Sequence, residues 1–394
     1  MPTLDDDHTG TRIKEQRRLA RLTQRALAAR IPYSYSLLNQ VECGARPATA
    51  DFVAAVAHAL NVDVTVLTGQ PYVTELQRDR LAELVRPIRE ALDLYDLGVN
   101  PDLRTRPATQ LIAEADRLCE EVRATHLRNA ARALPSAIAE LTHTAWATPS
   151  TQLWQALAST YRTAHDIAVK LGYYDLSAVA LDRMAWAAER ASDPCLGAVR
   201  QYMRALVYFR EGEYTIGQRL ISSGHSIVGA ADPTREALAV TGQLHLGGSV
   251  ICARANDVPA VGQHIAEARD IAKRTGEAAD VHWLSFGPTN VRLHKMSTAV
   301  EMGQYDEALK QARKMRLPVS LATSRRAHFL IDRARTEMET GHTEAALEHL
   351  VAARKTAPEQ TRYHPGARET IRGLVHLARR TPDTLNHMAA WVGL

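Results

Sequence analysis

Four polar side chains between residues 11 and 69 have the types and spacing that read bases in DNA. Thr23 and Ser34 can each begin a short helix, because a hydroxyl at that position accepts a backbone N–H group of the first turn. Leu38 and Val41 are spaced to pack the second helix against the first, as in a helix-turn-helix. The opposite face then stays free and carries Tyr35, Ser36, Asn39 and Gln40. Such short or planar groups can form hydrogen bonds to base edges in the major groove.

The same segment is strongly basic. Residues 11–48 contain eight basic side chains and two carboxylates, a net charge of +6, whereas the whole chain carries a formal net charge of +4. The rest of the chain therefore sums to −2. Basic charge concentrated beside a helix that can read bases indicates a polyanionic partner. The basic residues are Arg12, Lys14, Arg17, Arg18, Arg21, Arg25, Arg30 and Arg46.

Residues 11–69 resemble the DNA-binding domain of the xenobiotic-response-element regulators, which are similar to Cro and repressor. The resemblance lies in Thr23-Gln24, Leu27-Ala28, Glu42, Gly44 and the predicted helix end at 57–62. It implies a domain of five helices, residues 1–70, that binds double-stranded DNA. In that family the Gln that begins helix two holds a phosphate and the first residues of helix three read bases. The residues implied to contact DNA are Gln24, Arg25, Tyr35, Ser36, Asn39, Gln40 and Arg46.

Three residues of this domain also have a structural interpretation. Glu42 is expected to pair with an arginine of the first helix such as Arg17, because a carboxylate repels phosphate. Tyr35 could cover the small core, although its place on the first turn of the reading helix favours a DNA contact. Pro32 stands where the family usually has a turn glycine. Since proline cannot adopt a positive φ, the turn must differ in detail.

Length and composition limit the remaining possibilities. A chain of 394 residues exceeds one ordinary domain, so a second unit must follow the first. Residues 1–10 lack the apolar run of a secretory signal, and the sequence has no stretch of 18 apolar residues, so we expect a cytoplasmic protein without a membrane partner. Cys43, Cys119, Cys195 and Cys252 lack metal-ligand spacing, which predicts reduced thiols, no metal and no cofactor.

Beyond the first domain the sequence is rich in Ala, Leu and Arg and has helical periodicity, which predicts an all-α fold. A connector, residues 71–107, is expected to contain a long helix over 74–97 followed by a loop. Helices are then expected over 108–134 and 136–147.

A repeated pattern follows within the second domain, residues 108–394. Its turns begin at Gly172, Gly212, Asn256, Gly303 and Gly341, which are 40, 44, 47 and 38 residues apart. Compact residues recur five places after each turn start, at Ser177, Gly217, Val261, Ala308 and Ala346. This pattern resembles tetratricopeptide repeats, with units longer than the usual ~34 residues, and residues 303–309 match best. Stacked helical hairpins of this kind curl into a superhelix with a concave face.

In such repeats the first helix of each hairpin lines the concave face. Helical spacing gives a surface that is apolar in the middle and polar at its ends, which suits an amphipathic ligand such as a short peptide or a small acyl signal molecule. An ordinary solvated helix face is the alternative. The expected ligand contacts are Tyr202, Met203, Leu206, Gln243, Val250, Asn290, His294, His328, Asp332 and Arg335.

The order of the two domains resembles the peptide-sensing quorum regulators and a large group of actinobacterial regulators. Residues 286–294 look like a recurring motif of the second group. The resemblance implies that Asn290 and its neighbours touch a ligand and that the repeats form a homodimer. Alternatively, Pro288 simply begins a repeat helix.

The sequence therefore predicts an all-α protein with a five-helix helix-turn-helix domain followed by a tetratricopeptide-like superhelix of helical hairpins. We expect a ligand-controlled transcription regulator that binds an inverted-repeat operator as a homodimer. No catalytic motif occurs in the sequence, so we expect no enzyme. The alternative is a repeat scaffold that binds a partner protein and uses its helix-turn-helix domain for recruitment.

Overall fold

The computed structural model describes residues 8–70, 75–378 and 381–394. Within these ranges the chain is helical apart from its connecting segments and one isolated antiparallel bridge between Ala278 and Phe286. The all-α prediction is confirmed. None of the described helices combines the length and the apolar character needed to cross a membrane.

Five short helices around a small core form the first domain. Thr23 and Ser34 begin the second and third helices as predicted, accepting the backbone N–H groups of Ala26 and Leu37. Gly44 follows the third helix with a φ of +78°, which glycine adopts without strain. The helices are α1 (Thr9–Leu19), α2 (Gln24–Ala28), α3 (Tyr35–Glu42), α4 (Ala50–Leu60) and α5 (Val64–Thr68).

Two predicted helix boundaries after this domain are wrong. The connector helix ends at Asp93, four residues before the expected end, and its expected start at Thr74 lies outside the described residues. The next break falls at Thr125, whose φ is +69°, while Pro135 lies inside a continuous helix. Burial of the apolar side chains around Pro135 against neighbouring helices outweighs the loss of one backbone hydrogen bond there. The three helices are α6 (Glu75–Asp93), α7 (Ala108–Arg123) and α8 (Leu127–Ala147).

Five helical hairpins follow, and their turns lie where the sequence predicts them. The turn residues Gly172, Gly212, Asn256, Gly303 and Gly341 all have positive φ, between +58° and +88°. The five compact residues predicted at the helix contacts are buried. The hairpins are α9 (Thr151–Leu171) with α10 (Tyr174–Ala191), α11 (Pro194–Glu211) with α12 (Tyr214–Val228), α13 (Arg235–Arg254) with α14 (Val258–Thr275), α15 (Pro288–Glu301) with α16 (Tyr305–Lys314), and α17 (Thr323–Glu339) with α18 (Thr343–Thr356).

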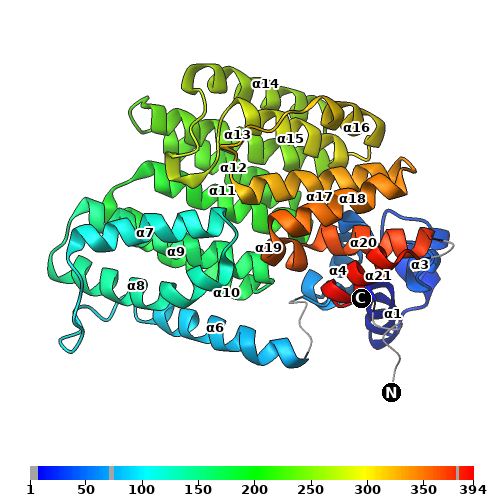
Figure 1. Ribbon diagram of the computed structural model, residues 1–394, viewed down its shortest axis with the longest axis horizontal. Helices are drawn as coiled ribbons and strands as arrows, with labels where there is room; N and C mark the ends of the chain where they lie inside the picture. Colours follow the sequence, from blue (N-terminus) through cyan, green and yellow to red (C-terminus); the bar gives the residue numbers. More distant parts are fainter. Residues whose placement is uncertain (1–7, 71–74, 379–380) are drawn as a thin grey trace.

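The end of the chain returns to the first hairpin. It forms α19 (Pro358–Tyr363), α20 (Pro365–Leu377) and α21 (Asp383–Val392). In Figure 1 the hairpins follow one another from α9 to α18, and α19 then lies near the beginning of the array. Contacts of α19 with α9, and of α17 with α7, close the curve of hairpins.

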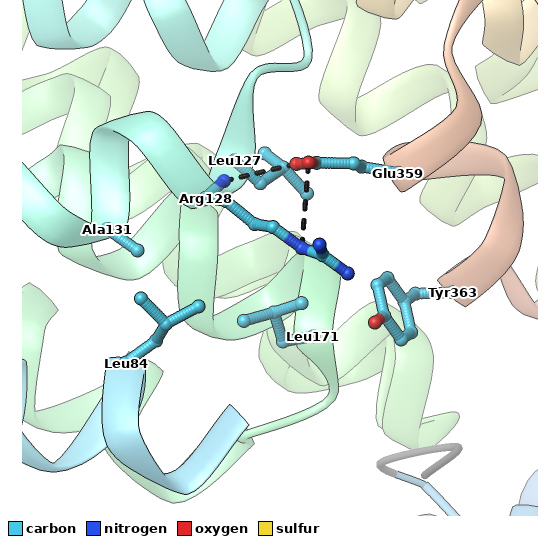
Figure 2. Close-up of a pocket in the computed structure, with 7 residues that line it drawn as sticks. All are labelled: Leu84, Leu127, Arg128, Ala131, Leu171, Glu359 and Tyr363. Carbon is cyan, nitrogen blue, oxygen red and sulfur yellow. Dashed lines mark hydrogen bonds and ion pairs between the residues drawn. The ribbon is translucent and has the colours of Figure 1, made fainter. Parts of the chain in front are cut away.

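Figure 2 shows this closure in detail. The backbone N–H of Arg128 on α8 donates to a carboxylate oxygen of Glu359 on α19 at 3.1 Å, and Arg128 Nε lies 3.8 Å from the other oxygen. The space enclosed beside them, between Leu84, Leu171 and Tyr363, measures only about 10 Å³. That volume holds about one water molecule, so this junction is a packed seam rather than a ligand pocket.

The helix-turn-helix domain is docked on the hairpins. Tyr174 donates its hydroxyl hydrogen to Gln70 at 3.1 Å, and Arg372 on α20 donates to the Thr9 hydroxyl at 3.2 Å. A cleft of about 600 Å³ lies between this domain and α20 and α21, and Arg46 is among the residues that line it. The two parts of the molecule therefore meet through a few specific contacts, among them that of α4 with α11.

Candidate DNA-binding face and candidate ligand site

The outer face of α3 is polar and open to solvent. Tyr35 is 46% exposed, and Ser36, Asn39 and Gln40 are exposed beside it. The opposite face of the helix is buried through Leu38. The structure thus brings all four predicted base-reading residues to one surface.

Basic side chains flank this face. The guanidinium of Arg25 on α2 lies over the ring of Tyr35, 6.0 Å from its centroid. Arg46, four residues beyond the end of α3, is exposed. Cations therefore lie near both ends of α3, as the predicted phosphate contacts of Arg25 and Arg46 require; these contacts stay predictions.

A buried ion pair fixes α3 relative to α1. Arg17 Nε and Nη2 donate to the two carboxylate oxygens of Glu42 at 2.6 and 2.8 Å. The two side chains are 10% and 2% exposed, and the hydrogen bond to Glu42 raises the pKa of Arg17. The predicted structural role of Glu42 is confirmed.

Gln24 joins the same cluster. Its side-chain amide donates to the Glu42 carboxylate at 2.8 Å and to the side-chain oxygen Oδ1 of Asn39 at 3.3 Å. Both amide hydrogens are therefore directed at acceptors within the domain. The contact of Gln24 with a DNA phosphate stays a prediction, and it requires that at least one of these hydrogen bonds give way.

A second polar cluster lies on the inner surface of the hairpins, which we define as the surface formed by α9, α11, α13, α15 and α17 together with α7 and α19. Gln243 donates to the hydroxyl of Tyr202 at 2.8 Å, and Asn290 donates to Gln243 at 3.4 Å. His294 Nδ1 lies 3.0 Å from the backbone oxygen of Asn290 and 3.3 Å from Arg325 Nη2. Four neighbouring hairpins, through α11, α13, α15 and α17, therefore contribute to one polar cluster.

Asn290 stands out within this cluster. The residue is only 1% exposed, and its Oδ1 has no hydrogen-bond partner among the described residues. Burial and the charge of Arg325 hold the pKa of His294 well below its usual value, so the imidazole is neutral at pH 7. A buried acceptor without a donor is costly, so an added donor at Asn290 Oδ1 would be stabilising; the ligand contact of Asn290 stays a prediction.

Charged side chains extend the cluster across α7 and α9. Arg123 Nη2 and Arg162 Nε lie 2.8 and 3.9 Å from the same oxygen of Asp166. One turn further along α9, Lys170 donates to Gln360 of α19 at 2.6 Å. Gln360 in turn donates to the backbone oxygen of Ser324, in the first turn of α17, at 2.9 Å. The cations lower the pKa of Asp166 to about 2, although burial alone would raise it.

The predicted ligand contacts divide into three groups. Tyr202, Gln243, Asn290 and His294 belong to the polar cluster described above. Met203 packs in the hydrophobic core, and Leu206 and Val250 are partly buried. The last three lie on α17, where His328 is 3.2 Å from His364, Asp332 accepts from Ser297 at 2.6 Å, and Arg335 donates to Tyr305 at 3.2 Å. Their binding role stays a prediction.

Three arginines of this surface were not among the predicted contacts. Arg123 lies on α7, before the first hairpin, so the repeat pattern contains no position for it. Arg162 on α9 and Arg325 on α17 are not among the positions that helical spacing assigned to the inner face. Neither carries a distinguishing signal in the sequence, because α9 and α17 contain several other polar and charged residues.

The inner surface reaches the DNA-binding domain through Asp51, on the first turn of α4. Asp51 Oδ1 accepts from the Tyr214 hydroxyl at 2.6 Å and lies 3.2 Å from Arg254 Nε. Arg254, 7% exposed, is also paired with Glu301 of α15 at 2.8 Å. Arg254 on α13 and Glu301 on α15 belong to helices of the inner surface, whereas the sequence contains no indication of a role for Asp51.

Three potential metal ligands that are distant in sequence also meet. Ligand atoms of Cys195, Glu236 and His282 lie within 4.8 Å of one another. Burial raises the pKa of the Cys195 thiol to about 12, and His282 Nε2 already lies 2.7 Å from the Glu236 carboxylate. The contact between His282 and Glu236 beside a protonated thiol accounts for this group, so we assign no metal to it.

Comparison with known proteins supports the first of the two sites. Residues 8–68 match a family model described as "Helix-turn-helix domain". None of the curated proteins compared with the chain matches it. The matched range spans α1 to α5 and contains the exposed face of α3. The protein is therefore an all-helical chain with an N-terminal helix-turn-helix DNA-binding domain followed by packed helical hairpins.

Proposed function

We propose that this protein is a sequence-specific transcription regulator, and not an enzyme, whose DNA binding is controlled by a small molecule or short peptide on the inner surface of the hairpins. The hairpins resemble tetratricopeptide repeats in the position of their turns, and such arrays commonly hold ligands on their inner face. The observation that carries the proposal is the contact of Asp51 with Arg254, which joins that surface to α4.

A ligand changes an equilibrium only if it binds one arrangement of the protein better than another. Arg254 interacts with Asp51 on the DNA-binding side and with Glu301 on the inner surface. A ligand that shifts α13 or α15 alters the geometry of this shared guanidinium. The docking of α4, and with it the position of α3, then responds to the ligand.

We also propose that two copies act together. A single α3 presents only a few base-reading side chains, too few for useful specificity, and paired half-sites solve this problem in helix-turn-helix regulators. Two-fold symmetry of the protein then requires an inverted repeat in the operator.

Replacement of Asp51 tests the proposal. Asp51→Ala removes the acceptor for Tyr214 and Arg254, whereas Glu15→Ala removes an exposed carboxylate of α1 and causes the same change in net charge. A typical allosteric coupling changes affinity about 5- to 150-fold, so Asp51→Ala should change DNA affinity at least about fivefold relative to Glu15→Ala. Fluorescence anisotropy with a labelled DNA duplex measures the affinity of each variant. Equal affinities would show that docking of α4 does not control DNA binding.

A further inference from the structure

We propose that the inner surface binds a compact anion, a phosphate or carboxylate group of a small molecule, through Arg123 and Arg325, beside the buried charge of Arg162. The inference rests on the proposed ligand role of this surface and adds the chemical class of the ligand. It starts from an excess of positive charge that the protein itself does not neutralise.

The main charges that act on Lys170 are three arginines and one carboxylate, Arg123, Arg210, Arg325 and Asp166, so that with Lys170 itself the net charge of this group is +3. Burial and the nearby charges of Arg123, Arg210 and Arg325 lower the pKa of Lys170 to about 8, in spite of Asp166. Like charges gathered inside a protein repel one another, and an anion is the partner that relieves the repulsion.

The arginines also have hydrogen-bond donors to spare. Arg123 and Arg162 converge on one oxygen of Asp166. The Nε groups of Arg123, Arg162 and Arg325 are buried and have no hydrogen-bond partner in the part of the chain that the structure describes. Arg162, only 2% exposed, already donates through Nη1 and Nη2 to the backbone oxygens of His282 and Trp283, so its contribution to an anion site is mainly its buried charge. A tetrahedral or planar oxyanion supplies several acceptors at once, in the charge-assisted hydrogen bonds that arginine forms best.

Asn290 extends the description of the ligand. Its buried Oδ1 needs a donor. A simple oxyanion has none, so the complete ligand should carry a hydroxyl or N–H group in addition to its charged group. An apolar ligand would leave Asn290 Oδ1 without a donor, and a cationic ligand would add to the repulsion among the arginines, each at a cost in free energy.

Sulfate and inorganic phosphate are suitable probes for the full chain. Thermal unfolding is followed as each anion is added up to about 10 mM, with chloride at matched ionic strength as the reference, because higher concentrations stabilise proteins nonspecifically. The variants are Arg325→Gln, Lys170→Gln in case the first does not fold, and Arg219→Gln. Arg219 is exposed on α12 and serves as the matched control.

The wild type and Arg219→Gln should show a saturable rise in melting temperature, because a ligand that binds only the folded state stabilises it. Arg325→Gln or Lys170→Gln should weaken the apparent affinity about tenfold or more. A rise that does not saturate, or that is the same in all variants, would overturn the anion site. Saturable binding that leaves DNA affinity unchanged would uphold the anion site and count against the proposed ligand control.

Discussion

Glu42 shows how one buried side chain can organise the DNA-binding domain. It accepts hydrogen bonds from Arg17 of α1 and Gln24 of α2 while lying on α3 itself. The position of the reading helix therefore depends on a carboxylate that need not touch DNA.

Removal of this carboxylate should loosen α3. Glu42→Ala leaves the buried guanidinium of Arg17 without its partner, which costs on the order of 3 kcal/mol. Amide hydrogen exchange in α3 of the full chain should then accelerate by about two orders of magnitude, if exchange there proceeds through local unfolding. Glu15→Ala, on the exposed side of α1, is the control. Equal exchange in the two variants would show that the ion pair does not hold α3 in place.

A contact between two residues could be predicted from the sequence where the chemistry of one residue requires a particular kind of partner. Glu42 was expected to pair with Arg17 because a carboxylate beside phosphates needs a cation. The contact of Arg325 with His294 joins two hairpins and depends on the rotation of two helices about their axes. Helical spacing alone fixes such a rotation only to within a residue or so, which is why the three arginines of the inner surface were missed.

At the level of helices, turns were predicted better than the ends of long segments. Gly172, Gly212 and Gly303 end helices because a left-handed backbone conformation suits glycine, and that preference is local. Pro135 was wrongly taken as a helix break. The packing of α8 on its neighbours decides this case, and packing cannot be read from one segment of sequence.

Gly212 tests whether the turn of the second hairpin positions the DNA-binding domain. A Cβ added at Gly212 would lie 2.6 Å from the Cβ of Ala54 on α4, whereas a Cβ at Gly303 would meet nothing within 4 Å. Both glycines are left-handed, with φ of +79° and +69°, so alanine costs about 1 kcal/mol of backbone strain at either position.

Gly212→Ala should therefore displace α4, and Gly303→Ala should not. Hydrogen exchange of the α4 amides, compared between the two variants, measures the displacement. The expected result is faster exchange in α4 for Gly212→Ala alone. Identical exchange would mean that the junction adapts to the extra methyl group.

At the scale of the whole molecule, the docking of the two domains could not have been predicted. Tyr214 and Asp51 are 163 residues apart in the chain, and neither the repeat pattern nor the helix-turn-helix resemblance contains information about their contact. The structure shows a direct ionic contact between Arg254 and Asp51, and the proposed ligand control depends on this contact.

The proposed pair of copies leads to a prediction about mass and operator symmetry. Light scattering of the full chain should give about twice 43.5 kDa, and the preferred site should be an inverted repeat. A monomer of 43.5 kDa that binds a single half-site tightly would contradict the homodimer.

Selection of bound duplexes from a random pool, followed by affinity measurements on the selected site and on random DNA, tests most directly whether α3 reads a specific sequence. The wild-type chain should enrich one site, and Gln40→Ala should lose about 1–3 kcal/mol of binding free energy on that site and little on random DNA, because base contacts carry discrimination. Arg46→Ala should weaken both interactions alike, since phosphate contacts are common to all sequences. Failure to enrich any site, or equal losses for Gln40→Ala on both kinds of DNA, would contradict sequence-specific regulation and favour the protein-binding scaffold.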